Sequence, residues 1–218
     1  MQKVSIIVPV WNEEDSVIKL VERIDASFSR HKIGYEIIFI DDNSTDKTVP
    51  TIQKLTGQYP VLLHAKVGKR GKARSLLQGF SYANNDIIAM IDADLQYPPE
   101  ELPRMVELLD DTTDIVVANR KQYKASFLRR ILSKGFHLFF TKTLHNLNHD
   151  AQSGMKVFKR QILDKLVLSP SPWSFDLEFL LRSRDAGYQI KSHNIMFQKR
   201  ESGAPKIKLL DAITEIGL

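Results

Sequence analysis

Short apolar runs alternate along the chain with longer segments in which apolar residues recur at helical spacing. The runs have the length of strands and occupy residues 4–10, 35–40, 61–65, 86–91 and 114–118. Between the first two runs, apolar residues lie about one helical turn apart, at Val17, Leu20, Val21, Ile24 and Phe28. Strands that alternate with helices imply right-handed crossovers and a mostly parallel sheet. We therefore expect an α/β fold, with helices flanking a central sheet, in a single domain over residues 1–218.

Polar residues and prolines indicate where the helices begin. We expect Asn12 to cap the first helix and Ser44 or Asp46 to cap the second, because their side-chain oxygens can accept hydrogen bonds from the first free N–H groups. Pro50 predicts an irregularity in the second helix, since proline lacks an N–H. Further helices are expected over residues 71–83, from Pro98 to about Asp110, and over residues 174–186.

The second half of the chain carries a basic amphipathic segment. Over residues 127–144, apolar and aromatic side chains (Phe127, Leu128, Ile131, Leu132, Phe136, Phe139, Phe140) alternate with basic ones (Arg129, Arg130, Lys134, Lys142). Such a helix can lie in a membrane interface or can pack its aromatic side on the sheet, and the pattern leaves both alternatives open. Residues 207–218 are amphipathic again. Extended structure is expected over residues 152–158 and 188–199.

Composition and charge limit the classes of protein to which this chain can belong. The chain has 218 residues, 43% of them apolar and 26% charged, and it has no cysteine, which excludes disulfides. No stretch of about 20 apolar residues is present, as a membrane-spanning helix would need. Residues 1–110 carry 13 Lys and Arg against 16 Asp and Glu, whereas residues 111–218 carry 18 against 10. An acidic half suited to a metal is thus followed by a basic half suited to phosphates or an anionic membrane.

Polar groups follow the first, second and fourth predicted strands: Trp11 to Glu13, Asp41 with Asp42, and Asp92 to Gln96. Because the carboxyl ends of parallel strands meet at one edge of a sheet, the three groups should face one crevice. Asp92 and Asp94 are one residue apart, and side chains at that spacing in an extended segment point the same way. An isolated Asp-x-Asp is more often a solvated turn. The two other strand-end groups favour a divalent-cation site, with Gln96 one step further along.

Other phosphate-binding motifs are excluded. The gap from Gly68 to Gly71 is too short for a phosphate-binding loop, and Ala73 stands where that loop needs a hydroxyl. No Gly-x-Gly-x-x-Gly follows the first strand, so a dinucleotide-binding domain is not expected. The six histidines lack a metal-binding spacing. We expect no nucleic-acid partner, and no pattern in the sequence indicates an oligomeric state.

The chain resembles the family 2 glycosyltransferases, and most closely their dolichol-phosphate mannosyltransferase-like branch, which transfers sugars to polyprenyl phosphates. The matching stretches run through nearly the whole chain and keep the same order. They are Val8-Pro9-Val10-Trp11-Asn12-Glu13, Asp41-Asp42-Asn43-Ser44-Thr45-Asp46, Lys69-Arg70-Gly71, Asp92-Ala93-Asp94-Leu95-Gln96-Tyr97-Pro98-Pro99-Glu100, Ser153-Gly154-Met155-Lys156 and Arg200-Glu201-Ser202-Gly203-Ala204-Pro205-Lys206. Each stretch alone is a weak signal, but together they are specific.

The resemblance implies a GT-A fold, a nucleotide-sugar donor, Mg²⁺ or Mn²⁺, and inversion at the anomeric carbon. The residues at matching positions that would contact the nucleotide are Pro9, Trp11, Glu13, Asp41, Asp42, Lys69 and Asp92. Asp92, Asp94 and Gln96 would bind the metal that bridges the two phosphates. Arg200 and Lys206 would lie on a loop that closes over the diphosphate. A hard cation with Arg and Lys is suited to a leaving group on which negative charge accumulates.

The acceptor distinguishes branches of the family. A polyprenyl phosphate is already an oxyanion and needs positive charge to dock it, whereas a sugar hydroxyl needs a general base. Arg120, Arg129 and Ser133 match the positions that bind the acceptor phosphate in the mannosyltransferase-like branch. Asp176 and Glu178 lie where other members carry a base, and Asp176 is the candidate, although as an early helical residue it could simply favour the helix dipole. Asp94, Arg120 and Asp176 are therefore the catalytic candidates.

Two departures from the family pattern affect these expectations: Trp11 stands in place of a tyrosine, and Pro205 in place of a serine. The transmembrane helices that commonly follow in this branch are not seen in the sequence. We expect residues 1–119 to bind nucleotide and metal and residues 120–218 to bind the acceptor. The predicted activity transfers one sugar from GDP-mannose, or else a UDP-sugar, to a polyprenyl phosphate at the cytoplasmic face of a membrane. The alternatives are transfer to a glycan hydroxyl with Asp176 as base, or a non-catalytic nucleotide-sugar-binding regulator.

Overall fold

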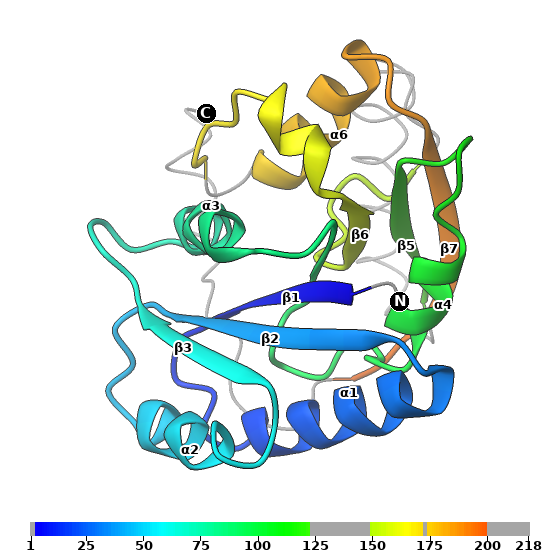
Figure 1. The fold of residues 1–218 in the computed structure, drawn as a ribbon. Coiled ribbons are helices and arrows are strands. Elements are labelled where there is room, and N and C mark those ends of the chain that lie inside the picture. Colours follow the sequence, from blue (N-terminus) through cyan, green and yellow to red (C-terminus); the bar gives the residue numbers. More distant parts are fainter. Residues whose placement is uncertain (1–2, 123–148, 172–173, 200–218) are drawn as a thin grey trace.

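The computed structural model describes residues 3–122, 149–171 and 174–199 (Figure 1). Strands and helices alternate in the first half of the chain, as the hydrophobic pattern predicts. The strands are β1 (Lys3–Val10), β2 (Gly34–Asp41), β3 (Val61–Ala65), β4 (Ile87–Met90), β5 (Ile115–Gln122), β6 (Lys156–Lys159) and β7 (Ile190–Phe197). The helices are α1 (Val17–His31), α2 (Thr48–Leu55), α3 (Lys72–Tyr82), α4 (Glu101–Glu107), the 3-10 helix η2 (Arg160–Asp164) and α6 (Phe175–Asp185).

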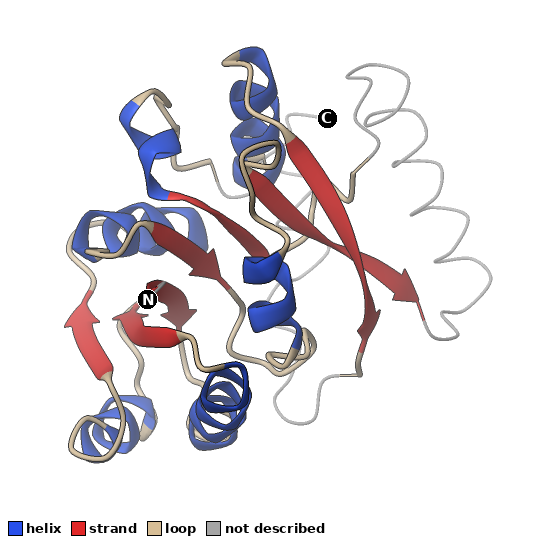
Figure 2. Ribbon diagram, turned by 45° about the vertical axis from the view of Figure 1, so that its right-hand side comes forward, coloured by secondary structure: helices blue, strands red, loops and turns tan. Residues whose placement is uncertain are grey.

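The described strands form one sheet in the order β3-β2-β1-β4-β6-β5-β7. β1 pairs in parallel with both β2 and β4, and β5 pairs in parallel with β7. β6 is antiparallel to its two neighbours, β4 and β5, and so joins two parallel halves. Figure 2 shows how the sheet twists between the helices. The prediction of an α/β fold with a mostly parallel sheet is confirmed.

Apolar side chains of the strands fill two cores, one on each face of the sheet. Along β1 and β2, successive residues alternate between the two faces, so that Ile6 and Ile37 belong to the core under α1, α2 and α4, and Ile7 and Ile38 to the core under α3 and α6. Helix α3 packs closely on the sheet: a Cβ placed on its Gly79 would lie 2.3 Å from Ile7 Cγ2. These two layers hold the strand ends rigidly relative to one another.

Several predicted element boundaries are wrong. Asn12 does not cap α1: it has φ 53°, and the N-cap residue is Ser16, because the chain first makes a turn in which Ser16 N–H donates to the Glu13 carbonyl. The N-cap residue of α2 is Lys47, so neither Ser44 nor Asp46 is its N-cap, although Asp46 accepts a hydrogen bond from Thr48 N–H at 2.9 Å. Pro50 lies in the first turn of α2, where its missing N–H matters least. Helix α4 is shorter than expected and ends at Glu107.

In the second half, β6 begins at Lys156, so the expected strand over residues 152–158 is a turn for most of its length. β5 extends to Gln122, beyond the expected end at residue 118, because it pairs with β7 along its whole length. The amphipathic segments 127–144 and 207–218 lie outside the described residues. Among the residues that are described, no helix has the length and apolar character needed to cross a bilayer. The division into a donor half and an acceptor half stays a prediction.

Candidate active site

The loops that follow β1, β2 and β4 meet at the carboxyl edge of the sheet. The loop after β1 contacts the loop after β2, since Asn12 N–H donates to Ser44 Oγ at 2.9 Å and Glu13 N–H donates to Thr48 Oγ1 at 2.7 Å. The loop before α3 joins them through Gly71 N–H, which donates to Asp42 Oδ2 at 2.8 Å. These hydrogen bonds place the loops after β1 and β2 and the loop before α3 side by side, and the crevice stays a prediction.

A flat aromatic surface lies at one end of this edge. Trp11 follows β1, and the guanidinium of Arg70 lies 5.0 Å from the centroid of its ring. Arg70 also donates to the carbonyl of Asn43 at 2.9 Å, so it spans the loops after β1 and β2. Indole and guanidinium faces are both suited to stacking on a nucleobase. Pro9, half-buried at the end of β1, orients the chain that carries Trp11.

The two aspartates after β2 have different surroundings. Asp41 accepts a hydrogen bond from Ser44 N–H at 3.2 Å. Asp42 forms an ion pair with Lys66, whose side chain is fully buried, in addition to its bond with Gly71. Asp42 thus fastens the loop that carries Lys69, which is itself exposed. Asp41 is buried, with 6% of its surface exposed.

The carboxylate stretch after β4 is a turn and not an extended segment. β4 ends at Met90, and Leu95 has φ 60°, a left-handed conformation that costs an ordinary residue roughly 1–2 kcal/mol. The side chain of Leu95 is 1% exposed, so its burial in the core offsets that strain. Asp94, 8% exposed, accepts a bond from Gln96 N–H at 3.1 Å. The prediction that Asp92 and Asp94 lie on an extended segment is therefore wrong, although the turn keeps the two carboxylates close enough for their charges to interact.

Asp92 forms an ion pair with Lys72, the first residue of α3. Burial raises the pKa of Asp92, Lys72 opposes this shift, and the neighbouring charge of Asp94 adds to it. The α-carbon of Gly154 lies against the same carboxylate: a Cβ placed there would be 2.4 Å from Asp92 Oδ2. The carboxylates of Asp92 and Asp94 lie close together, and the Lys72 ammonium beside Asp92 indicates that this site favours positive charge.

A magnesium or manganese ion would fit these residues if substrate phosphates and waters completed its coordination shell. In the described part of the chain, no three His, Asp or Glu side chains are grouped so that they could enclose a metal. Asp92 and Asp94 each have a carboxylate whose hard oxygens could ligate such an ion. Mg²⁺ beside substrate phosphates is typically held by one or two carboxylates, with the phosphates and waters completing its shell. Gln96 is bonded to Gln198, which donates its N–H to the Gln96 carbonyl at 2.9 Å, so the end of β7 adjoins the turn.

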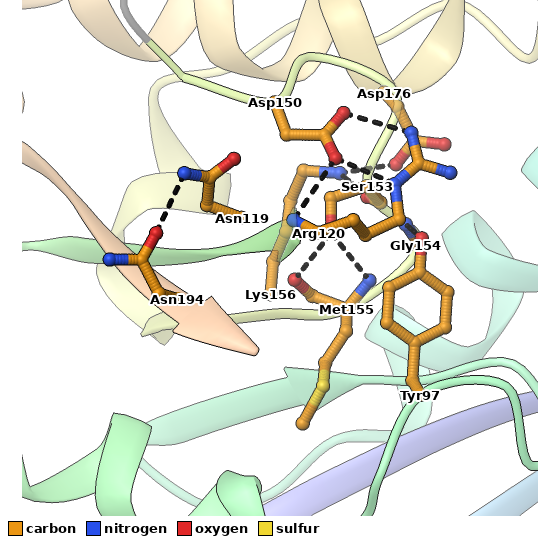
Figure 3. Close-up of polar contacts among 10 residues, drawn as sticks. All are labelled: Tyr97, Asn119, Arg120, Asp150, Ser153, Gly154, Met155, Lys156, Asp176 and Asn194. Carbon is orange, nitrogen blue, oxygen red and sulfur yellow. Dashed lines mark hydrogen bonds and ion pairs between the residues drawn. The ribbon is translucent and has the colours of Figure 1, made fainter. Parts of the chain in front are cut away.

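Arg120, near the end of β5, is held by Asp150 (Figure 3). Its Nε and Nη2 donate to the two carboxylate oxygens at 2.6 and 2.9 Å, and its guanidinium lies 5.4 Å from the ring centroid of Phe197. Burial alone would raise the pKa of Asp150, but the Arg120 hydrogen bonds outweigh it and hold that pKa below its ordinary value. The forked ion pair fixes the orientation of the guanidinium.

Asp176, at the start of α6, forms an ion pair with Lys156, whose side chain is fully buried. Lys156 also donates to the carbonyl of Ser153, and burial lowers its pKa. Tyr97 contacts the same turn, because its hydroxyl accepts a bond from Gly154 N–H at 2.8 Å. Burial raises the pKa of Tyr97 to about 12, so the phenol stays neutral.

The structure brings together the predicted residues of the β1, β2 and β4 loops, with Arg120 and Asp176 beside the turn Asp150–Lys156. Arg129, Ser133, Arg200 and Lys206 lie outside the described residues. Sequence reasoning missed the partners Lys72, Asp150 and Lys156. A lysine inside the apolar run Met155-Lys156-Val157-Phe158 was a usable signal, because a lysine among strand residues is buried only when it is paired. The other two carry no local signal.

Replacing Gly154 by Ala should lower turnover about a hundredfold, since a displacement of about 1 Å in a catalytic group has an effect of that size. The new methyl would overlap Asp92 Oδ2 and lie 2.9 Å from Lys72 Nζ, so both groups must move. Gly57, whose Cβ would meet no atom within 4 Å, gives the control G57A. Steady-state rates of both variants check this, and near-normal turnover of G154A would contradict the packing described.

The chain is similar to known proteins in sequence and in fold. Residues 5–167 match the model of the Glycosyl transferase family 2. A dolichol-phosphate mannosyltransferase of Pyrococcus furiosus is 29% identical over 213 residues, which cover 94% of this chain and 59% of that protein. An undecaprenyl-phosphate 4-deoxy-4-formamido-L-arabinose transferase of Klebsiella pneumoniae is 33% identical over 172 residues, covering 77% of this chain and 52% of that protein. The chain thus spans little more than half the length of these relatives.

Among solved structures, glucosyl-3-phosphoglycerate synthase from Mycobacterium tuberculosis, in complex with Mn²⁺, UDP and phosphoglyceric acid, has a TM-score of 0.73 at 18% identity. The match covers 98% of this chain and 74% of the synthase chain. This likeness confirms the predicted GT-A fold. With three quarters of the sequence matched by the family model and the strand-end carboxylates in place, the chain belongs to the Glycosyl transferase family 2.

Proposed function

We propose that the protein is a metal-dependent, inverting glycosyltransferase that moves one sugar from a nucleotide donor to a polyprenyl phosphate at the cytoplasmic face of a membrane. The relatives that share most of this chain are named for transfer to dolichol phosphate and to undecaprenyl phosphate. GDP-mannose is the first candidate donor, and a UDP-sugar is the second, because the structural neighbour was crystallised with UDP.

One observation carries this proposal: the fixed guanidinium of Arg120 lies on the same edge of the sheet as the carboxylate turn, and Tyr97, which directly follows that turn, lies near it. The ring centroids of Tyr97 and Phe197 are 4.9 Å apart, and the Arg120 guanidinium lies 5.4 Å from the centroid of Phe197, so this cation is close to the residue that directly follows the carboxylate turn. The nearby carboxylate Asp176 is occupied by Lys156. A docked oxyanion beside a metal-bound diphosphate is the arrangement that an acceptor phosphate requires.

In this mechanism Trp11, Asp41 and Lys69 hold the nucleotide, and Asp92 and Asp94, with Gln96, would hold the divalent cation. When bound, that cation would stabilise the negative charge on the departing diphosphate. Arg120 orients the acceptor phosphate, whose oxygen attacks the anomeric carbon from the side opposite the diphosphate. The new carbon–oxygen bond forms as the bond to the diphosphate breaks, and no proton has to be removed from the acceptor.

The remaining members of the site come from the resemblance. We propose that Arg129 and Ser133 add to the acceptor-phosphate site and that Arg200 and Lys206 cover the diphosphate. Gln198, two residues before Arg200, is bonded to Gln96 of the carboxylate turn, which supports the second assignment. The basic amphipathic segment 127–144 would place the acceptor half at the membrane surface.

Transfer from a panel of labelled nucleotide sugars tests the function. GDP-mannose and UDP-glucose would be incubated with the protein, Mn²⁺ and a short polyprenyl phosphate, and the label that enters the organic phase would be counted. We expect label from one donor, dependent on the phosphate of the lipid and abolished by EDTA. Label found only on added glycan acceptors, with Asp176→Ala inactive and Arg129→Ala active, would favour the hydroxyl-acceptor alternative. Nucleotide binding without transfer to any acceptor would favour a regulator.

A further inference from the structure

The turn Asp150–Lys156 contacts Arg120, Tyr97 and Asp176 (Figure 3). Asp150 holds Arg120, and Gly154 N–H bonds to the Tyr97 hydroxyl. The Gly154 α-carbon lies against the Asp92 carboxylate. Whatever fixes this turn therefore also fixes a proposed metal ligand and the proposed acceptor-binding arginine.

The side chain of Lys156 ties down the end of this turn. Its ammonium is fully buried and has two partners, the carbonyl of Ser153 inside the turn and the carboxylate of Asp176 on α6. Ser153 N–H closes the turn by donating to the Asp150 carbonyl at 3.1 Å. A buried ammonium needs a counter-ion, and Asp176 supplies it.

We infer that Lys156 and Asp176 are positioning residues whose ion pair holds the Ser153–Gly154 turn against Asp92, and that Asp176 is the counter-ion of Lys156 and not a proton acceptor. This deepens the proposed function, since an acceptor that is already an oxyanion needs no base. The contact runs from Asp176 through Lys156 and Ser153 to Gly154 and Asp92. Metal affinity should therefore depend on a pair that does not itself ligate the metal.

Mn²⁺ binding to the whole chain tests this inference without turnover. Mn²⁺ alone would be titrated into wild type, K156M, D176N and the double variant K156M/D176N, with the free ion followed by its EPR signal. Loss of a residue that orients a metal ligand typically weakens metal affinity about 10–100-fold, and we expect that range for all three variants. The double variant should lose no more Mn²⁺ affinity than the single variant that binds Mn²⁺ less tightly, because the two substitutions break the same ion pair.

Turnover separates positioning from base catalysis. If the pair only positions Asp92, excess Mn²⁺ should restore most of the lost rate in D176N and in the double variant. A deficit of about a thousandfold or more that persists at saturating Mn²⁺ would overturn the inference, since removal of a general base can cost up to about 10⁴-fold. The double variant buries no unpaired charge, so it carries the test where D176N fails to fold.

The control is the neighbouring pair at the other end of β6. Lys159 has the same two kinds of partner, the Asp110 carbonyl and the Asp114 carboxylate, each at 2.8 Å, but these lie away from the turn. K159M should keep Mn²⁺ affinity within about twofold of wild type, because distant sites act independently. Unchanged Mn²⁺ affinity in K156M would overturn this inference and leave the proposed function standing. Wild type that binds Mn²⁺ without transferring sugar to polyprenyl phosphate would instead refute the proposed acceptor, and wild type that binds no Mn²⁺ would overturn both.

Discussion

Asp94→Asn should reduce sugar transfer on the order of a thousandfold, with the fold retained. A divalent cation at a leaving group supplies several kcal/mol of stabilisation in the transition state, and each 1.36 kcal/mol is a factor of ten in rate. Asparagine keeps the size of the side chain and can still accept the bond from Gln96 N–H, but it lacks the negative charge. The single-turnover rate with saturating donor, together with Mn²⁺ affinity by EPR, measures the loss.

Asp86→Asn is the matched control for this variant. Asp86 directly precedes β4, at the opposite end of the strand from Asp94, and it is exposed. It should transfer sugar at the wild-type rate. Equal rates for D94N and wild type, or a loss in D94N that appears without weaker Mn²⁺ binding, would remove Asp94 from the metal site.

Much of the fold could be predicted from the sequence, because apolar residues form short continuous runs in its strands and recur at helical spacing in its helices. The five strands predicted in the first 118 residues are all present. Element ends were predicted less well, since they depend on tertiary contacts. β5 runs on to Gln122 because β7 pairs with it, and no local pattern in residues 119–122 announces this. Asn12 has the residue type of a helix cap, yet its side chain bonds to the loop after β2, and Thr45 N–H donates to its Oδ1 at 2.7 Å.

The site was predictable where its residues follow strand ends, and was not where it depends on contacts between distant elements. Asp41, Asp42, Asp92 and Asp94 are adjacent to apolar runs, so topology alone places them on one edge. Lys72 and Lys156, by contrast, lie 20 residues from Asp92 and from Asp176, respectively, in the sequence. The apolar neighbours of Lys156 indicate that it is buried and paired, but for both lysines only the fold reveals which carboxylate is the partner.

The charges of the site alternate in a way that explains its buried lysines. Asp92 is paired with Lys72, Asp150 with Arg120, and Asp176 with Lys156. Asp94 lies close to the Asp92–Lys72 pair, and its negative charge adds to the raised pKa of Asp92. A divalent cation would therefore enter a region in which these three carboxylates already have cationic partners.

Arg120→Met should both abolish measurable transfer and destabilise the protein by about 3–5 kcal/mol, the range found when one partner of a buried ion pair is removed. Asp150 is 8% exposed and accepts two hydrogen bonds from the guanidinium, so it would be left as a buried carboxylate without its cation. Urea unfolding at neutral pH measures the stability, and transfer to a polyprenyl phosphate measures the activity.

The double variant R120M/D150N separates these two effects. Removing both charges should restore most of the stability, whereas transfer should remain lost, because the acceptor phosphate still has no guanidinium to dock on. The stability difference between wild type and R120M should also depend on pH. Arg120 holds the pKa of Asp150 below its ordinary value of 3.8, so the pair stabilises the protein above that value and stops doing so as the pH falls through the lowered pKa. Transfer by R120M/D150N at the wild-type rate would show that Arg120 serves the fold alone, and the acceptor phosphate would then have to be docked by other cations.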